Sequence, residues 1–453
     1  MRRIAQFSLT VIISISMFAA CANREVARVD PTQSKENFKD IPVELNRDID
    51  LVFVIDNSGS MNEEQLSLAA NFNRFINVLE NIEGGLPNVR IGVVSTDTGA
   101  GPNNGGTGCS ANGDNGGLRT NPACGVSNAF IEDIEGANGT RMTNYTGNLS
   151  DTFSCLATLG INGCGFEQPL ESIKRALDGS NPANNNFLRE NAFLAIIIVS
   201  DEDDCSVYNS TMFDTTQNDP NAPLGALSSF RCFEFGVQCE PDDPRTPGPR
   251  QNCVPRDDSN YMTPVMEYVD FVKSLKEDTS QIIVGGIIGN PTPVSVGVDV
   301  ENNNIPKLVP SCVSASGEAA PSTRLKFFLD QFPQRNTVTT ICNENLEDAL
   351  VVIAELLRKV IGNPCMDGDI DTDPNTPGVQ YDCQVSDVRF PDTEEETQTI
   401  IEECNGSGRL PCWELVENRM QCPESDSGME LVINREGDNV PSGTHVQARC
   451  VVL

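Results

Sequence analysis

Five short, mainly apolar runs place the strongest constraint on how this chain can fold. Runs of this kind are typical of strands that are buried on both faces, as in a parallel sheet covered by helices. Between them, apolar residues recur at helical spacing in three segments, 68–82, 265–275 and 346–360. The sequence therefore predicts an α/β fold with a mostly parallel sheet. The expected strands are Leu51–Ile55, Val89–Val94, Phe193–Val199, Ile282–Ile288 and Val338–Ile341, with Phe130–Ile134 as a short edge strand.

The composition excludes several classes of function. His445 is the single histidine, which argues against Ser-His-Asp and Cys-His hydrolases, His-ligated zinc enzymes and haem proteins with a His pair. The formal net charge of -34 repels phosphate backbones, so we expect no nucleic-acid partner. With 453 residues and 38% hydrophobic content, the chain can form one large domain and a smaller one.

The N-terminus has the pattern of a secretory signal. Arg2 and Arg3 precede the apolar stretch Ile4–Phe18, which is too short for a membrane span, so residues 1–20 are predicted to be a signal peptide. The stretch ends in Phe-Ala-Ala-Cys21, which resembles a bacterial lipobox. In that case Cys21 is lipidated and becomes the mature N-terminus, and the acyl chain is the only membrane attachment. An ordinary cleavage site that happens to precede a cysteine is the alternative.

The cysteine count agrees with export to an oxidising compartment. Without Cys21, 16 of the 17 cysteines remain, an even number that allows complete pairing. Residues 21–44 are polar without clear periodicity and are interpreted as the lipidated N-terminus and a tether. Residues 99–128 and 205–261 interrupt the strand and helix pattern and carry cysteines, so we expect two disulfide-stapled loop inserts.

The pattern changes near residue 363. From there, short alternating segments indicate a small β-rich domain, residues 363–453, that holds six cysteines and the only tryptophan, Trp413. The body, residues 45–362, keeps the other ten. Each unit can therefore close its own disulfides, although the count leaves the connectivity open.

Oxygen-bearing side chains follow the first expected strand. Leu51–Ile55 leads into Asp56-Asn-Ser58-Gly-Ser60 and then an amphipathic helix, which places a carboxylate and two hydroxyls at the carboxyl edge of a parallel sheet. Open α/β sheets bind ligands at this edge. The segment resembles the start of a von Willebrand factor A domain, whose metal-ion-dependent adhesion site opens with Asp-x-Ser-x-Ser. Hard oxygen ligands suit Mg²⁺, with Ca²⁺ or Mn²⁺ as alternatives.

The resemblance covers residues 45–362 and implies a doubly wound, Rossmann-like sheet. Asp201, at the end of Phe193–Ser200, matches the aspartate of the family's adhesion site. Where the family has a threonine this chain has Cys164, so Glu167 from the same loop becomes the candidate oxygen ligand. Asp97, which ends the second strand, is a second-shell candidate.

Details of these loops lead to two further expectations. Cys164 is expected to pair with Cys155 across the preceding helix. Residues 93–97 (Val-Val-Ser-Thr-Asp) and 163–167 (Gly-Cys-Gly-Phe-Glu) are similar to those of a bacterial lipoprotein branch of the family.

Other interpretations of these motifs remain. Asp56 and the two serines could simply cap the following helix, because Asp and Ser are favoured there. A haloacid dehalogenase-type phosphatase would need a second aspartate where Ser58 stands, and a serine nucleophile would need a base that is not visible. The alternating carboxylates of Asp367–Asp373 lack the spacing of a calcium-binding hand, which favours a solvated acidic linker.

Together these patterns predict binding and not catalysis. We expect an extracytoplasmic protein that is lipid-anchored to a bacterial membrane and located at the outer membrane or the cell surface. The resemblance implies that a partner's carboxylate completes the coordination of the metal, which suits adhesion or the assembly of a surface complex. The expected partner is a protein in the envelope or on another cell surface. A metal-independent structural scaffold of the envelope is the alternative.

Overall fold

The computed structural model describes residues 35–42 and 47–452, apart from 83–84, 104–108, 137–139, 303, 315–316, 363–364, 367, 374–377, 379, 391–395, 405–408, 420–421, 423–424 and 436–443. The predicted signal peptide, Cys21 and residues 21–34 and 43–44 of the predicted tether lie outside the described residues. Within these ranges, no helix has the length and apolarity that crossing a membrane requires.

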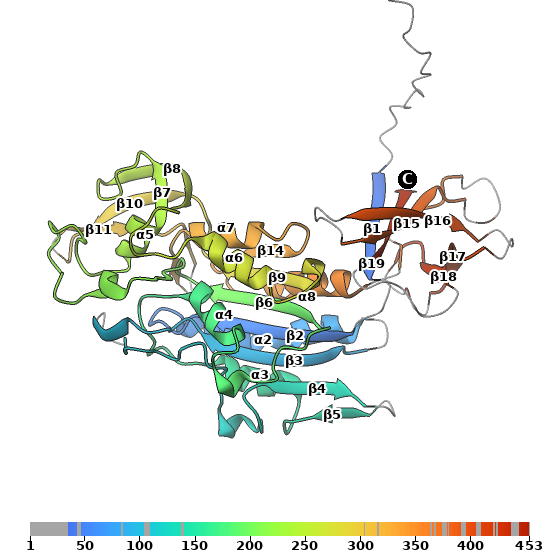
Figure 1. Ribbon diagram of the computed structural model, residues 1–453, viewed down its shortest axis with the longest axis horizontal. Coiled ribbons are helices and arrows are strands. Elements are labelled where there is room, and N and C mark those ends of the chain that lie inside the picture. Colours follow the sequence, from blue (N-terminus) through green and yellow to red (C-terminus); the bar gives the residue numbers. More distant parts are fainter. Residues whose placement is uncertain are drawn as a thin grey trace, which may run out of the picture.

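A large mixed sheet forms the centre of the body (Figure 1). Its seven strands follow the order β14-β9-β6-β2-β3-β4-β5, in which the first five are parallel and β4 and β5 are antiparallel additions at one edge. All six strands expected from the sequence are present, and β5 is an addition. The strands are β2 Asp48–Ile55, β3 Asn88–Ser95, β4 Ile131–Glu135, β5 Arg141–Thr143, β6 Phe193–Ser200, β9 Ile282–Ile288 and β14 Asn336–Thr340.

Helices cover both faces of this sheet. Side chains alternate along β2, so that Leu51, Phe53 and Ile55 join one hydrophobic core and Val52 and Val54 join the other. This double burial explains why the strand is apolar throughout. The first face carries α2 Asn62–Glu80, α3 Leu149–Ala157 and α8 Glu347–Gly362, and the second carries α4 Pro169–Leu177, α6 Val265–Lys273 and α7 Thr323–Asp330.

Two segments that are distant in sequence build a second sheet. The expected insert contributes helix α5, Phe230–Gly236, and two strands, and the chain after β9 contributes the other two. This lobe lies at one end of the central sheet, and the C-terminal domain lies at the opposite end (Figure 1). The strands are β7 Val237–Glu240, β8 Gly248–Pro255, β10 Val294–Asp299 and β11 Ile305–Leu308, in the order β11-β10-β8-β7; the short pair β12 Cys312–Val313 and β13 Glu318–Ala319 follows.

The C-terminal sheet contains a strand from the N-terminal region. Residues Lys35–Pro42 form β1, which pairs antiparallel with β19, so the prediction that this stretch belongs to a tether is wrong. Half of its residues are charged, which is common in exposed edge strands and hides the period-two pattern. The other five strands are β15 Cys383–Arg389, β16 Thr397–Glu403, β17 Cys412–Glu417, β18 Met429–Asn434 and β19 Thr444–Val452, and the six-stranded order is β1-β19-β15-β16-β17-β18.

A buried polar contact joins this domain to the body. His445 on β19 lies with its Nε2 atom 2.8 Å from Ser280 Oγ and 3.4 Å from Asp278 Oδ2. Because the serine and the aspartate meet the same ring nitrogen, the three residues do not form a relay from nucleophile to base to acid. The contact is an attachment between the two units.

Disulfides close within each unit, as the cysteine count predicted. The predicted pairing of Cys164 with Cys155 is wrong: Cys164 bonds to Cys109, and Cys155 bonds to Cys124. Cys124 and Cys155 pack in the same hydrophobic core as α3, the helix that contains Cys155. Cys109 and Cys164 belong to a separate core cluster. The other six disulfides are Cys205–Cys232, Cys239–Cys253, Cys312–Cys342, Cys365–Cys422, Cys383–Cys450 and Cys404–Cys412.

Candidate functional site

Asp56 is held at the carboxyl edge of the central sheet. Its backbone N–H donates to Val199 O at 2.9 Å, which continues the pairing of β2 with β6 beyond the end of the strand. Its carboxylate accepts hydrogen bonds from Ser58 N at 2.8 Å and from Ser200 Oγ at 2.7 Å. The residue is fully buried. The sheet therefore positions this carboxylate rigidly.

The serines after Asp56 do not cap the next helix. Helix α2 has Met61 as its N-cap residue, with no side-chain hydrogen bond to the first turn. Ser58 Oγ instead lies 3.1 Å from Ser60 Oγ, and Ser60 hydrogen-bonds the side chain of Asp201. The helix-cap interpretation of this motif is therefore wrong.

Glu167 is brought against Asp56 from a separate loop. It is fully buried, and its Oε2 atom accepts a short hydrogen bond from Thr96 Oγ1. Its Oε1 atom has no hydrogen-bond partner in the described part of the chain. The backbone on each side is fixed as well, because Gln168 N donates to Thr96 O at 3.0 Å and Cys205 N donates to Glu167 O at 2.7 Å.

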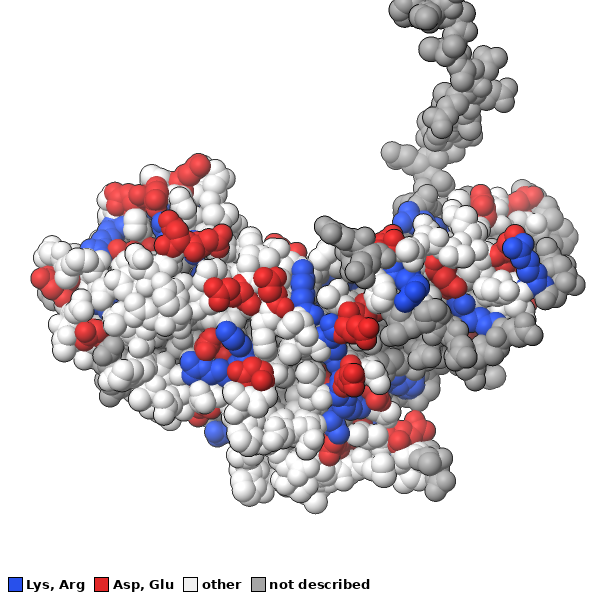
Figure 2. Space-filling view, viewed as in Figure 1, with Lys and Arg blue, Asp and Glu red and all other residues white. Residues whose placement is uncertain are grey.

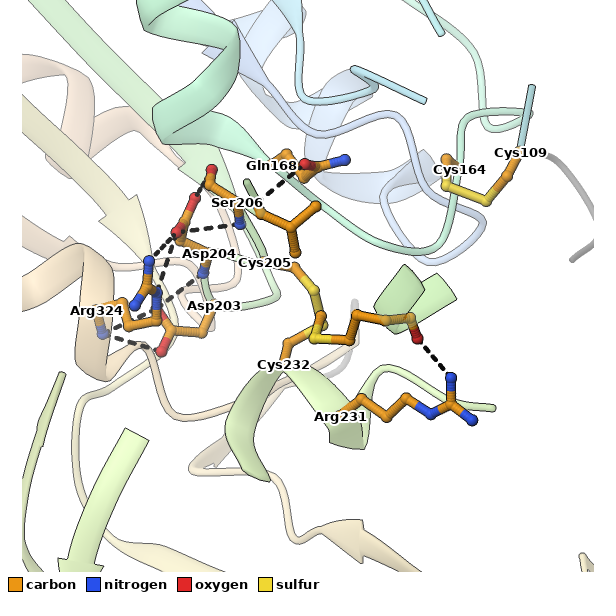
Figure 3. Close-up of a disulfide and its surroundings, with 12 residues drawn as sticks. Cys109, Cys164, Gln168, Asp203, Asp204, Cys205, Ser206, Arg231, Cys232 and Arg324 are labelled. Atoms are coloured by element: carbon orange, nitrogen blue, oxygen red, sulfur yellow. Dashed lines mark hydrogen bonds and ion pairs between the residues drawn. A yellow bond between two sulfur atoms is a disulfide. The ribbon is translucent and has the colours of Figure 1, made fainter. Parts of the chain in front are cut away.

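Asp97 hydrogen-bonds the loop that carries Glu167. Its carboxylate accepts hydrogen bonds from Gly99 N at 2.9 Å and from Cys164 N at 3.3 Å. Cys164 is also bonded to Cys109, so the loop that carries Glu167 is fixed both by a carboxylate and by a disulfide (Figure 3). Asp97 thus acts on the site through the loop.

The acidic side chains at this edge raise one another's pKa values. Burial is the largest cause, followed by the neighbouring negative charges, and together they raise the pKa of Asp201 to about 9 and that of Glu202 to about 8. The pKa of Glu167 is raised well above its ordinary value by burial and by the charges of Asp56 and Glu202. Burial also raises the pKa of Asp56. These carboxyl groups form one electrostatic unit.

The next two acidic residues have a different environment. Asp203 accepts hydrogen bonds from Arg324 N and Leu325 N at the start of α7, and Asp204 Oδ2 lies 3.0 Å from Arg324 Nη2 (Figure 3). The chain therefore supplies a cation and helix N–H groups to Asp203 and Asp204. Among the described residues, no Lys or Arg is a cause of the pKa shifts of Asp56, Glu167, Asp201 or Glu202.

A cavity of about 350 Å³ opens beside this cluster. Ser60, Asp201 and Glu202 line it on the side of the central sheet, and residues of α5 and β11 line it on the side of the insert. Ser60 is exposed, so the cluster can be reached from solvent through the cavity.

The sequence analysis missed several polar groups of the site. Thr96 and Ser200 hydrogen-bond Glu167 and Asp56, and both stand at the ends of predicted strands, where Asp97 and Asp201 were found. Gln65 on α2 joins two loops by donating to Asp56 O and Gly160 O at 2.8 and 3.0 Å. Glu64 is buried near Asp56 with an unpartnered Oε2 atom.

The cluster mixes carboxyl and hydroxyl groups. Within the described ranges, no three His, Cys, Asp or Glu side chains are grouped so that they could hold a metal ion. The predicted residues nevertheless lie together, because serine contacts link Asp56, Ser58, Ser60 and Asp201, and the charge of Asp56 raises the pKa of Glu167; the set is Asp56, Ser58, Ser60, Asp201 and Glu167.

Comparison with known proteins gives low similarity throughout. No protein-family model and no curated protein matches the chain. Among solved structures it is similar to the pilus adhesin SpaC of Lactobacillus rhamnosus GG in its open conformation, with 10% identity over 93% of this chain and 42% of that chain and a TM-score of 0.30. The pilus adhesin RrgA of Streptococcus pneumoniae has 10% identity over 92% of this chain and 58% of that chain, with a TM-score of 0.28.

A third structure comprises the three N-terminal domains of the type V pili tip protein Mfa5 of Porphyromonas gingivalis. It has 14% identity over 92% of this chain and 68% of that chain, with a TM-score of 0.22. The structural neighbours are thus bacterial pilus proteins, and this chain spans less than two thirds of the first two. At such low TM-scores, the likeness carries no argument about the function of this chain.

Proposed function

We propose that this protein is an extracytoplasmic lipoprotein whose doubly wound von Willebrand factor A-type domain binds a protein partner through a divalent metal ion. Asp56, Ser58, Ser60 and Asp201 hold Mg²⁺, with Ca²⁺ or Mn²⁺ as alternatives, and Glu167 supplies the oxygen for which the family uses threonine. When bound, the ion supplies a positive charge and a coordination position for a carboxylate of the partner. The role is binding, not catalysis.

The observation that supports this proposal is the pair of unpartnered carboxylate oxygens. Among the described residues, Glu167 Oε1 and Asp201 Oδ1 have no hydrogen-bond partner, and their residues are only 0% and 4% exposed. A buried carboxylate is costly unless a cation or hydrogen-bond donors compensate it. Two such oxygens beside Asp56 and two serine hydroxyls form a set of hard oxygen donors that fits Mg²⁺.

The positions of β1 and of the candidate site are compatible with a membrane-anchored binding protein. Strand β1 enters at the end of the molecule that carries the C-terminal sheet, and the insert lobe beside the candidate site lies at the other end (Figure 1). A lipid attached before β1 would therefore be joined to the chain at the end of the molecule opposite the insert lobe.

Calorimetric titration of Mg²⁺ into the soluble body tests the metal site. The parent protein should bind one ion, and Asp56→Ala should abolish binding. Glu167→Gln should weaken binding strongly, because it removes a charge while it preserves size. Glu132→Gln is the matched control. Glu132 lies outside the site, where it forms an ion pair with Arg90 at 2.9 Å, so this variant should bind Mg²⁺ as the parent does.

Partner capture separates the two proposed roles. Partners retained from an envelope extract should be released by chelator if the metal mediates binding. Retention that is indifferent to chelator would favour the alternative, a metal-independent scaffold that uses the inserts or the C-terminal domain. Unchanged Mg²⁺ affinity in Asp56→Ala would contradict the adhesion-site assignment itself.

A further inference from the structure

The cavity beside the candidate metal site has two chemically different walls. Ser60, Asp201 and Glu202 form the polar wall at the edge of the central sheet. Phe230 and Phe233 of α5 and Ile305 and Leu308 of β11 are the apolar residues of the opposite wall, which also contains Asp299, Asn302 and Lys307. One continuous cavity therefore joins the proposed metal-binding residues to apolar side chains of the insert.

The apolar wall is part of a structured lobe. Phe230 and Phe233 pack with Val294 and Val296 in a small core of their own, and Leu308 packs against this core. The disulfides Cys205–Cys232 and Cys239–Cys253 fix the same lobe. The apolar surface is therefore held in position beside the polar wall and does not depend on a partner to form.

Two exposed apolar residues adjoin the lining residues in the sequence. Val300, which follows the lining residue Asp299, is 74% exposed, and Val309, between the lining residues Leu308 and Pro310, is 40% exposed.

We propose that the occupant of this cavity is a segment of a partner protein in which an aspartate or glutamate stands next to a bulky apolar residue. The carboxylate reaches the metal at Ser60 and Asp201, and the apolar side chain packs against Phe230, Phe233, Ile305 and Leu308. A volume of about 350 Å³ lies at the small end of the range for ligand pockets, which suits side chains and not a folded element. The inference rests on the proposed metal-dependent binding and specifies its partner.

Charge argues against a second copy of this chain as the occupant. The formal net charge is -34, and acidic side chains gather over the insert lobe at the upper left of Figure 2. Two such surfaces repel each other. A different protein, which presents its carboxylate beside apolar residues, fits the cavity better.

Four synthetic hexapeptides test this specificity by fluorescence anisotropy in excess Mg²⁺. Their central residues are Leu-Asp-Leu, Ala-Asp-Ala, Lys-Asp-Lys and Leu-Asn-Leu. The Leu-Asp-Leu peptide should bind at least tenfold more tightly than the Ala-Asp-Ala peptide, because burial of a leucine side chain favours binding by about that factor. Chelator or the Leu-Asn-Leu sequence should abolish binding.

A substitution in the apolar wall provides a second measurement. Leu308→Lys should weaken binding of the Leu-Asp-Leu peptide about tenfold although it adds a positive charge, which by itself would attract the carboxylate. Val254→Lys is the matched control: Val254 is 50% exposed on β8 of the same sheet and does not line the cavity, so binding should not change.

The outcomes distinguish this inference from the proposal on which it rests. Absence of Mg²⁺ binding in calorimetry would overturn the metal site. If Mg²⁺ binds but the Leu-Asp-Leu and Ala-Asp-Ala peptides bind equally, or the Lys-Asp-Lys peptide binds best, only the apolar specificity is overturned. Preferential binding of a polygalacturonate oligosaccharide over all four peptides would overturn the assignment of a protein partner.

Discussion

Asp204 and Arg324 form an ion pair at 3.0 Å in which neither side chain is exposed. The pair joins the loop after β6 to helix α7, and Arg324 also donates to Thr263 O at 2.8 Å. Three positions earlier in the same loop, Asp201 is buried, and its pKa is raised by burial and by the charges of Asp56 and Glu202. One short segment thus contains both a compensated carboxylate and an uncompensated one.

Arg324→Met should destabilise the fold strongly. The substitution leaves Asp204 buried without its cation, and breaking a buried ion pair in this way costs about 3 to 5 kcal/mol. Urea unfolding measures the loss. Arg409→Met provides the control, because the Arg409–Glu402 pair is 74% and 60% exposed and its removal should cost at most about 1 kcal/mol. Equal losses in the two variants would contradict this account of the loop.

Removal of the Cys109–Cys164 disulfide should affect both stability and metal affinity. With alanine at both positions, the free energy of unfolding should fall by about 4 kcal/mol, since the bond closes a loop with a sequence separation of 55. Mg²⁺ affinity should fall too, because this bond holds the loop that carries Glu167.

The control for that variant is removal of Cys404–Cys412, which closes a separation of only 8 residues. It should cost about 2.5 kcal/mol and leave Mg²⁺ affinity unchanged. If both double variants bind Mg²⁺ as the parent does, the disulfide has no role in positioning Glu167.

Asp278→Asn should change how stability depends on pH. Burial alone would raise the pKa of Asp278, but hydrogen bonds from His445 and Ser280 outweigh it, and the net pKa is lowered. A carboxyl group with a lowered pKa in the folded state stabilises above its unfolded pKa of about 3.9 and loses that contribution as the pH falls through the folded value.

The measurement is the free energy of unfolding of the parent and of Asp278→Asn between pH 3 and pH 7. The difference between the two should shrink as the pH falls below about 4, where Asp278 becomes protonated. A difference that grows below about pH 4 would mean that the contact with His445 does not act as described.

The central strands could be predicted because burial on both faces leaves a direct mark on the sequence. Leu51–Ile55 and Phe193–Val199 are apolar throughout, since each side chain enters one core or the other. The sequence of strand β1 has no such apolar run. It is an edge strand, and it forms by pairing with β19. The alternation of Val294, Val296, Val298 and Val300 is a period-two signal that could have revealed β10.

The candidate site could be predicted only where it follows a strand. Asp56 and Asp201 were found because each directly follows a buried run, and Thr96 and Ser200 could have been found by the same rule. The pairing of Cys164 with Cys109 could not, because sequence separation does not say which loops meet at the edge of a sheet. Nor does the sequence reveal the cavity, which residues from distant parts of the chain form together.

The central claim is that Asp201 and Glu167 are buried for a metal ion and not for the stability of the fold. Unfolding of the parent, Asp201→Asn and Asp203→Asn, with and without Mg²⁺, tests it most directly. The parent should gain about 2.7 kcal/mol at a Mg²⁺ concentration 100 times the Kd. Asp203→Asn, whose carboxylate bonds to the start of α7, should keep the gain.

Asp201→Asn is the decisive variant, with unfolding measured at pH 7. It should be more stable than the parent without metal, because it removes a buried carboxyl group whose pKa is raised to about 9, and it should lose the gain from Mg²⁺. A parent that gains nothing from Mg²⁺, together with an Asp201→Asn variant less stable than the parent, would contradict the account.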